Sequence, residues 1–260
     1  MSNGASGEMP FLDHLEELRR RLFWALGALV ICMMTAFAIV WRYDVIGFLA
    51  VPIEPYLPNG KLIFTHPADP IGIVVKVAFG IGLVAASPVI VYQIWAFLSP
   101  ALHKHEKRIV IPVLIGATGL FATGVFLCVQ FVLPAMFEVL LSFQSASLEQ
   151  MISAAEYFSF AVTLCLAFGG AFQLPIVVLA LTALGLVNPT VLGKFRRHAM
   201  VGSLVAAAII TPGDMILMTL MLGVPLYGLY EVSIVLSWFV HRSREKRLRA
   251  DAASVGQAVP

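Results

Sequence analysis

Long apolar runs alternate with short polar segments along most of the chain. The first run, residues 22–41, has twenty residues without a charge, which is enough helix to cross about 30 Å of hydrocarbon. Further apolar runs cover about 71–97, 109–133, 157–184, 199–211 and, after the turn signal T-P-G-D at 211–214, the stretch up to 239. This pattern predicts an all-α membrane protein with six transmembrane helices, of which the last two are short. The run 199–211 corresponds to only about 20 Å of helix, so we expect a thinner bilayer around it.

A polar but periodic segment precedes the first apolar run. Apolar residues recur at helical spacing from Phe11 to Leu22, while the other faces carry acids and three arginines. This spacing predicts an amphipathic helix that lies at the membrane surface before the first span. We therefore divide the chain into an amphipathic segment (1–21), a six-helix transmembrane domain (22–239) and a charged, disordered tail (240–260).

Prolines mark the places where regular spans should stop or bend. Residues 42–70 contain five prolines, at positions 52, 55, 58, 67 and 70, which predicts an ordered cap or short surface helices outside the membrane. Pro88 falls inside the second span and should kink it. Gln173 and Pro175 interrupt the fourth span in the same way.

Composition favours a membrane location, and the distribution of charge orients the chain. Hydrophobic residues make up 60% of the chain and charged residues 12%, whereas about a quarter of a soluble domain is charged. Of the 17 Lys and Arg residues, 14 lie in four segments, 19–21, 104–108, 194–197 and 242–249, which all fall on one side of the predicted membrane. Because positively charged segments stay in the cytoplasm, both termini are predicted to be cytoplasmic.

The sequence contains no clear metal, cofactor or catalytic motif. Cys32, Cys128 and Cys165 lie far apart inside apolar runs, where cysteine usually acts as a small buried hydrophobic residue. His103 and His105 form an H-x-H pair, which is a weak metal signal without further ligands. We therefore expect no cofactor, no enzymatic activity and no nucleic-acid partner.

Three polar residues lie within or beside the last spans, where an ionisable group is expensive and points to a function. Glu231 is inside the final span, and it either has such a function or pairs with a donor on another helix. Gln173 either lines a functional surface or joins two helices by a hydrogen bond. Asp214 follows the T-P-G turn, where it could also cap the next helix.

Glu17 and Glu106 are two further acids, and both stand beside basic residues outside the spans. One interpretation is a solvated ion pair with a neighbour, worth less than about 1 kcal/mol. The other is that both carboxylates receive a guanidinium group from a partner, because the planar fork of arginine binds carboxylate in a bidentate manner.

At these residues the chain resembles the TatC family, the multispanning receptor subunits of the twin-arginine protein translocase. The resemblance covers about 11–239 and rests on HLEELRRR (14–21), SPVIVYQIWAFLSPALHKHEKR (87–108), AFGGAFQLP (167–175) and TPGD (211–214). It implies that Glu17 and Glu106 contact the paired arginines of a signal peptide, with Arg19 and Phe97 supporting that cytoplasmic surface.

Three more positions match the family, one of them with a change. Pro52 corresponds to a proline of the first periplasmic loop, and Asp214 to an acid after the fifth span. Many family members carry glutamate in the fourth span where this chain has Gln173. Glutamine keeps the hydrogen bonding but removes the titratable charge.

The resemblance implies a receptor and core subunit of a translocase that exports folded proteins across the bacterial cytoplasmic membrane. Its partners would be twin-arginine signal peptides, a TatB-like single-span subunit near the fifth span, a TatA-like subunit recruited for transport, and further copies of the chain itself. The proton-motive force would drive transport.

Two other functions compete with this interpretation. A small-molecule secondary transporter could use Gln173 and Glu231 as groups at the membrane midplane, but it would be expected to show inverted repeats, and none is apparent. An intramembrane enzyme would need a catalytic constellation, which the sequence lacks.

Overall fold

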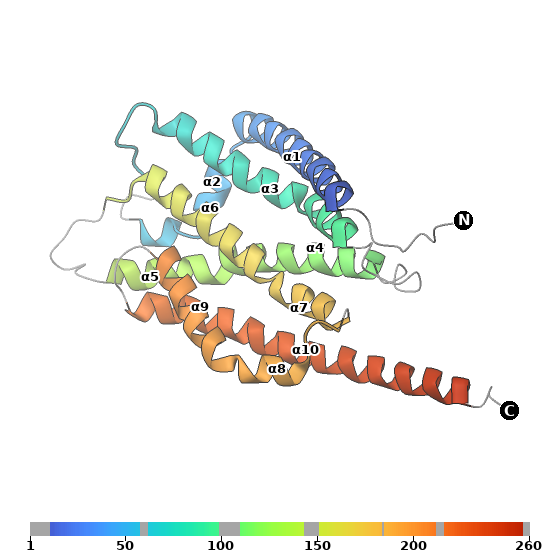
Figure 1. The fold of residues 1–260 in the computed structure, drawn as a ribbon. Helices are drawn as coiled ribbons and strands as arrows, with labels where there is room; N and C mark the ends of the chain where they lie inside the picture. Colours follow the sequence, from blue (N-terminus) through green and yellow to red (C-terminus); the bar gives the residue numbers. More distant parts are fainter. Residues whose placement is uncertain are drawn as a thin grey trace.

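The chain folds into a bundle of helices (Figure 1), and the computed structural model describes residues 11–57, 62–98, 110–142, 151–183, 185–211 and 216–256. Its elements are α1 (Phe11–Arg42), α2 (Val45–Ala50), the 3-10 helix η1 (Glu54–Tyr56), α3 (Asp69–Leu98), α4 (Val110–Leu127), the π-helical turn η4 (Cys128–Val132), α5 (Leu133–Ser142), α6 (Ala154–Ala171), α7 (Leu174–Ala183), α8 (Pro189–Lys194), α9 (Arg196–Ile210) and α10 (Ile216–Gly256). Within these residues the only β-type pairing is a single bridge between Ile63 and Ser153. The all-α prediction is confirmed.

Five helical segments of the described chain are long and apolar enough to cross a membrane: Leu15–Arg42, Asp69–Phe97, Leu114–Leu141, Ala154–Ala183 and Ile216–Arg242. The chain is thus a multi-pass membrane protein. Helix α9 has 15 residues, about 22 Å at 1.5 Å per residue, and is shorter than these five segments.

The helices run back and forth between two ends of the bundle (Figure 1). The N-terminal end of α1 and the C-terminal end of α10 lie at one end, called here the termini end, while α2 and η1 lie at the other, called here the cap end. Helices α1 and α3 form the most extensive pair; α6 packs on α3 and α4, and α10 packs on α7 and α9.

Glycine allows two of these helix pairs to approach closely. A Cβ atom on Gly82 of α3 would lie 2.7 Å from the Cα atom of Met33 on α1. A Cβ atom on Gly169 of α6 would lie 2.8 Å from the ring of Phe121 on α4. Because atoms at these distances clash, a larger residue at either position would push the two helices apart.

Prolines widen or break two of the spans, whereas others lie inside continuous helices, such as Pro225 in α10. Pro134 follows the π-turn η4, and because proline has no N–H to give to the carbonyl four residues back, the helix widens there, with Leu133 N donating to Cys128 O instead. The fourth span breaks between α6 and α7, at Phe172 and Gln173, as predicted. By contrast, α3 is continuous through Pro88, where the Ser87 hydroxyl donates at 2.7 Å to the Val84 carbonyl that Pro88 cannot reach.

The proline-rich segment forms the short helices α2 and η1 at the cap end, as the proline density predicted. The Tyr157 hydroxyl of α6 donates to the Leu49 carbonyl of α2 at 2.9 Å. Ile53 is fully buried beside them. The bridge at Ile63 joins this segment to the start of α6, through Ile63 N to Ile152 O at 3.1 Å.

Three predictions about the two ends of the chain are wrong. No separate surface helix precedes the first span, because α1 continues unbroken from Phe11 to Arg42. The last span is not short, since its apolar part, Ile216–Arg242, has 27 residues. The tail is not disordered throughout, because α10 continues to Gly256. Residues 242–251 are mostly Arg, Lys, Glu, Leu and Ala, which favour a helix although most of them are polar.

Candidate functional site

The register of α1 against α3 places Glu17 at the termini end. The two helices run in opposite directions, and Met33 lies opposite Gly82. Counting back along α1 and forward along α3 from this contact, Glu17 comes level with the C-terminal end of α3. Glu106 belongs to the part of the sequence that follows α3.

One oxygen of the Glu17 carboxylate is occupied and the other is open. Oε1 accepts hydrogen bonds from Nε of Arg21 at 3.0 Å and from its Nη2. Arg21 stands one helical turn further along α1, so this ion pair is local. Oε2 is buried and has no hydrogen-bond partner among the residues that the structure describes. The Glu17 side chain is 12% exposed, so the open oxygen is shielded from bulk water.

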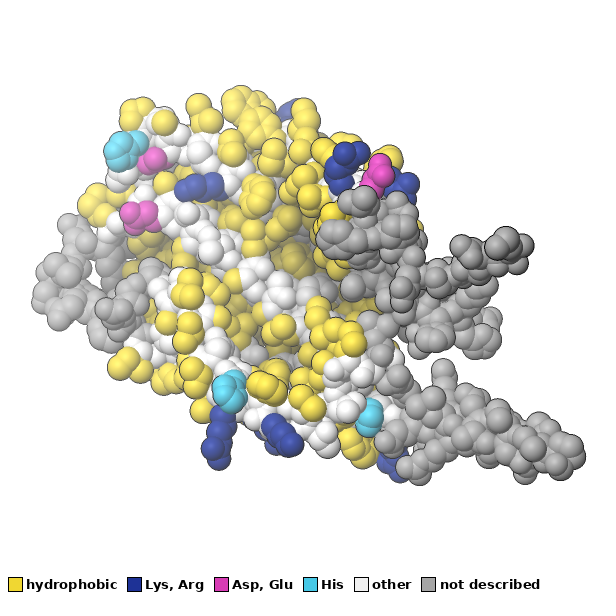
Figure 2. All heavy atoms as spheres, viewed as in Figure 1, with side chains coloured by type: hydrophobic (Ala, Val, Ile, Leu, Met, Phe, Trp, Pro, Cys, Tyr) yellow, Lys and Arg dark blue, Asp and Glu magenta, His cyan; other side chains and the backbone are white. Residues whose placement is uncertain are grey.

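A hollow of about 830 Å³ runs along the same face of α1. The described residues that line it are Glu16, Glu17, Arg19, Arg20, Phe23, Trp24 and Gly27. Figure 2 shows charged side chains of both signs gathered at this end of α1. The hollow therefore combines acidic, basic and aromatic groups, a set suited to a partner that is both charged and apolar.

The structure places the other predicted members of this surface differently. Arg19 does not bind Glu17; it points outward, with Nη2 at 3.9 Å from Glu16 Oε1 and 73% of its side chain exposed. Phe97 is half-buried at the end of α3. Glu106 lies outside the described residues. The site predicted around Glu17, Arg19, Phe97 and Glu106 is thus seen in part.

Glu231 forms a closed network between α10 and the start of α9. Its Oε2 lies 2.9 Å from Nη2 of Arg196, and its Oε1 accepts a hydrogen bond of 2.6 Å from the hydroxyl of Tyr227. Tyr230 adds a hydrogen bond to the Leu192 carbonyl of α8 at 2.8 Å. Both oxygens of Glu231 have partners. Of the two alternatives given for this residue, the structure shows pairing with a donor on another helix.

Gln173 joins two helices. It sits at the break between α6 and α7, and its Nε2 donates to the carbonyl of Ala117 on α4 at 2.9 Å. The structure does not bring Gln173 and Glu231 into one site, since Gln173 binds α4 and Glu231 binds α9. A shared substrate site for a small solute therefore has no geometric support.

The remaining predicted residues lie elsewhere. Pro52 is half-buried in the turn between α2 and η1. Asp214 lies outside the described residues. In the described part of the chain, no group of three or more metal-binding side chains comes together.

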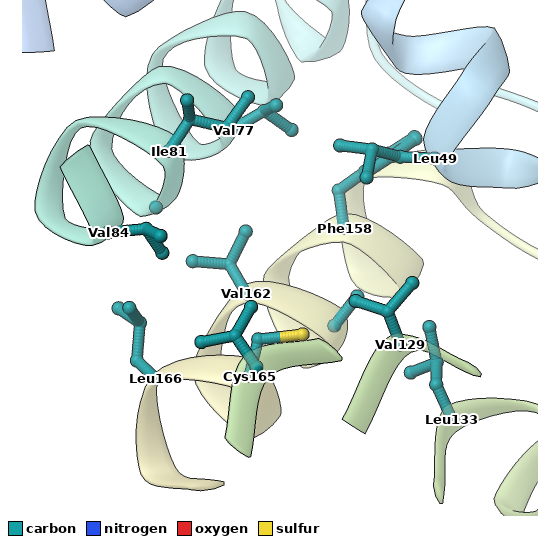
Figure 3. Close-up of a pocket in the computed structure, with 13 residues that line it drawn as sticks. Leu49, Val77, Ile81, Val84, Val129, Leu133, Phe158, Val162, Cys165 and Leu166 are labelled. Carbon is teal, nitrogen blue, oxygen red and sulfur yellow. The ribbon is translucent and has the colours of Figure 1, made fainter. Parts of the chain in front are cut away.

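An apolar cavity of about 210 Å³ lies inside the bundle, between α2, α3, η4 and α6 (Figure 3). Val77, Ile81 and Val84 face it from α3, and Val162 and Cys165 face it from α6. Its volume exceeds that of engineered apolar cavities, about 150 Å³, that accept benzene. The cavity therefore has room for one bulky apolar side chain.

Sequence reasoning missed two interactions that hold the bundle together. Arg21 was counted only as one of three arginines, although its position four residues after Glu17 identifies it as the partner. Thr182 of α7 and Ser237 of α10 are both fully buried, and their hydroxyls share a hydrogen bond of 2.7 Å. No local signal in the sequence pairs these two residues, which are 55 positions apart.

The chain matches one protein family over most of its length. The model of the family described as Sec-independent protein translocase protein (TatC) matches residues 13–225. Relatives that carry that description come from several bacteria. The one from Deinococcus radiodurans is 40% identical over 232 residues, covering 88% of this chain and 85% of the relative.

The relative from Aquifex aeolicus is 38% identical over 244 residues and covers 93% of this chain and 100% of the relative. The one from Escherichia coli K12 is 33% identical over 231 residues, with 88% of each chain covered. A crystal structure of the twin-arginine translocase receptor TatC superposes with a TM-score of 0.79 at 38% identity, over 87% of this chain and 99% of that one.

Proposed function

The chain belongs to the TatC family of Sec-independent protein translocase proteins, and from this premise we propose that it is the receptor for twin-arginine signal peptides and a core subunit of the translocase that exports folded proteins. The observation that carries the proposal is the open, shielded oxygen of Glu17 beside a hollow at the termini end. A secondary transporter finds no support among the relatives.

We further propose six spans, with α9 as the fifth, and both termini on the cytoplasmic side of the bacterial inner membrane. The two chain ends share one end of the bundle (Figure 1), which requires an even number of crossings. Arg19–Arg21 lie near the start of α1 and Arg242 closes the apolar part of α10, and positive charge flanking a span in this way favours the cytoplasm.

Recognition begins with charge. A guanidinium group of the signal peptide would donate to Oε2 of Glu17, which Arg21 leaves free, and such charge-assisted bonds are strong and directional. Glu106 would supply a second carboxylate from the part of the sequence that follows α3. Two carboxylates can each bind one of two adjacent arginines. A lysine ammonium group cannot form the same bidentate contact with a carboxylate.

The apolar part of the signal peptide would then enter the bundle. The cavity of Figure 3 begins at Val84, 13 residues before Phe97, or about 20 Å along α3. An extended peptide covers this distance with about six residues. A bulky apolar side chain at that position of the peptide would fill the cavity, while the aromatic side chains of Phe23 and Trp24 would line its path.

Assembly with partners completes the function. We propose that a TatB-like single-span subunit packs near α9, that a TatA-like subunit is recruited for transport, that further copies of the chain join the receptor complex, and that the proton-motive force drives transport. The shortness of α9 supports this placement, because a thinned bilayer beside it would lower the barrier for moving a folded protein.

The test is the binding of a synthetic twin-arginine signal peptide to the purified protein in nanodiscs. We expect a peptide with Lys-Lys in place of Arg-Arg, or the variant Glu106→Gln, to weaken binding by tenfold or more, which is about 1.4 kcal/mol. Glu231 lies away from the hollow and both of its oxygens have partners, so Glu231→Gln serves as a matched charge control with a smaller effect. Equal binding in all combinations would refute the receptor site proposed here.

A further inference from the structure

We propose that the outer face of α4 and η4, centred on Gln130, is a contact surface between two copies of this chain within the membrane. This Gln130 face consists of Ile115, Gly119, Ala122, Thr123, Phe126 and Gln130, all exposed. It lies apart from Glu17 and from the cavity, and it rests on the proposed function in that it supplies a contact surface for the further copies of the chain in the receptor complex.

Gln130 is a polar residue deep in the membrane. It belongs to the span Leu114–Leu141, 16 residues from one end and 11 from the other, so it lies only about 4 Å from the middle of the span. Among the residues that the structure describes, none forms a hydrogen bond with its amide. An amide in hydrocarbon without a hydrogen-bond partner is unfavourable, which is why membrane proteins normally turn such groups toward other helices.

The Gln130 face points away from the bundle. Ala117, Phe121 and Cys128 are buried, on the side where α4 and η4 pack against α6. At 100° per residue, Gly119, Phe126 and Gln130 lie on the opposite side of the helix. Phe126 is 60% exposed, and no described atom lies within 4 Å of a Cβ placed on Gly119.

The backbone at Gln130 is adjusted locally. Pro134 stands four residues later and has no N–H, so the Gln130 carbonyl lacks the donor that an α-helix would supply. The π-turn shifts the hydrogen bonding by one residue, as Leu133 N does for Cys128 O. The side-chain amide of Gln130 is therefore the polar group of this outer face that has no partner among the described residues.

A second copy of the chain is the partner that this group fits. Two copies inserted with the same topology are related by a two-fold axis along the membrane normal, which brings each residue to the same depth as its counterpart. A primary amide donates and accepts, so two Gln130 side chains satisfy one another across such an axis. Gly119 and Ala122 are small enough to let the two helices approach closely, as membrane helix pairs require.

Cysteine cross-linking in membrane vesicles tests this surface. In a variant with Cys32, Cys128 and Cys165 replaced by alanine, we would introduce Thr123→Cys or Phe126→Cys and oxidise with copper phenanthroline. We expect a disulfide-linked dimer of twice the monomer mass. Ile31→Cys on α1, where Ile31 is 68% exposed, is the matched control and should give at least fivefold less dimer.

Three results would overturn the proposal: no dimer at either position, a dimer whose yield is unchanged by Gln130→Leu, or a cross-link to a smaller partner instead of a second copy. We expect Gln130→Leu to lower the dimer yield at least fivefold and Gln130→Asn, which keeps the amide, to retain most of it. Relative to the parent with its three cysteines replaced, binding of the twin-arginine peptide should be unchanged in the variants at Gln130, Thr123, Phe126 and Ile31. This comparison separates failure of this proposal from failure of the proposed function and shows that the variants fold.

Discussion

Glu17 on α1 and Glu231 on α10 each bind an arginine, but they use their oxygens differently. Glu231 engages both, Oε2 with Arg196 on another helix and Oε1 with the Tyr227 hydroxyl. Glu17 engages only Oε1, with Arg21 on its own helix. Its Oε2 is buried and unpartnered among the described residues.

The difference separates a structural ion pair from a binding group. A carboxylate with a partner on each oxygen has little need of a further donor, and the partners of Glu231 join α10 to α9. A buried carboxylate oxygen without a hydrogen-bond donor is unfavourable, so a donor from a ligand would stabilise it. Glu17 has such an oxygen and lines a hollow. The exposed fraction of the side chain would suggest the opposite assignment, because the Glu231 side chain is 31% exposed and the Glu17 side chain only 12%.

The largest effect should come from removing the charge of Glu17. We expect Glu17→Gln to weaken binding of the twin-arginine peptide at least tenfold, because the amide cannot form a charge-assisted bond with a guanidinium group. Titration of the peptide into nanodisc-embedded protein measures this. Glu231→Gln is the matched control and should bind the peptide within twofold of the original chain. Equal losses of binding in the two variants would contradict the assignment of Glu17 as a binding group and Glu231 as a structural one.

The next largest effect concerns stability. Removing the charge of Glu231 should lower the free energy of unfolding by about 1–2 kcal/mol, since a partly exposed ion pair and a tyrosine hydrogen bond are lost together. The melting temperature in detergent should fall by a few degrees. The exchange of partners, Glu231→Arg with Arg196→Glu, should recover part of the loss, and no recovery would mean that the ion pair contributes nothing.

A smaller change should follow from Arg21→Gln. Without the guanidinium group of Arg21, the Glu17 carboxylate is fully available and uncompensated, so we expect the peptide to bind about two- to fivefold more tightly. The gain should shrink as salt is raised, because the attraction is screened. Weaker binding in this variant would show instead that Arg21 holds Glu17 in its binding position.

The smallest effect should come from Gln173→Leu. This change removes the hydrogen bond to the Ala117 carbonyl and should cost about 1 kcal/mol of stability, typical of an interhelical hydrogen bond in a membrane. Peptide binding should stay within twofold. A tenfold loss of peptide binding, with stability unchanged, would show that Gln173 takes part in peptide binding and does not only join two helices. Gln173→Glu completes the series, because it places a titratable carboxylate at the same position.

Run lengths and prolines predicted most of the fold. The first four long spans, the break at Phe172 and Gln173, and the short helices α2 and η1 follow from local composition, because apolar length and proline act within a few residues. The last span was predicted too short. The continuity of α1 through residue 22 was missed, since a change from amphipathic to apolar composition does not itself interrupt a helix. The helical part of the tail was missed for a related reason: polarity was taken as disorder.

The site was predictable only where its contacts are local. The Arg21–Glu17 pair follows helical spacing and could have been deduced from the four-residue separation. The Arg196–Glu231 pair spans 35 positions and depends on α9 folding back along α10, which no local pattern encodes. The same holds for the hydrogen bond between Gln173 and Ala117, 56 positions apart. Glu17 and Glu106 were selected by their charge and by the family resemblance, while the open oxygen of Glu17 required coordinates.

The π-turn η4 makes the third span sensitive to the number of its residues as well as to their kinds. It accommodates one residue more than an α-helical turn would. If residues 128–132 wound as a regular α-helix with their number unchanged, everything after them would rotate by about 100° about the helix axis. Met136 and Phe137, now buried, would swing out of the core. In evolutionary terms, insertions and deletions here are coupled to the packing of α5, so the length of this turn should drift less freely than that of any surface loop.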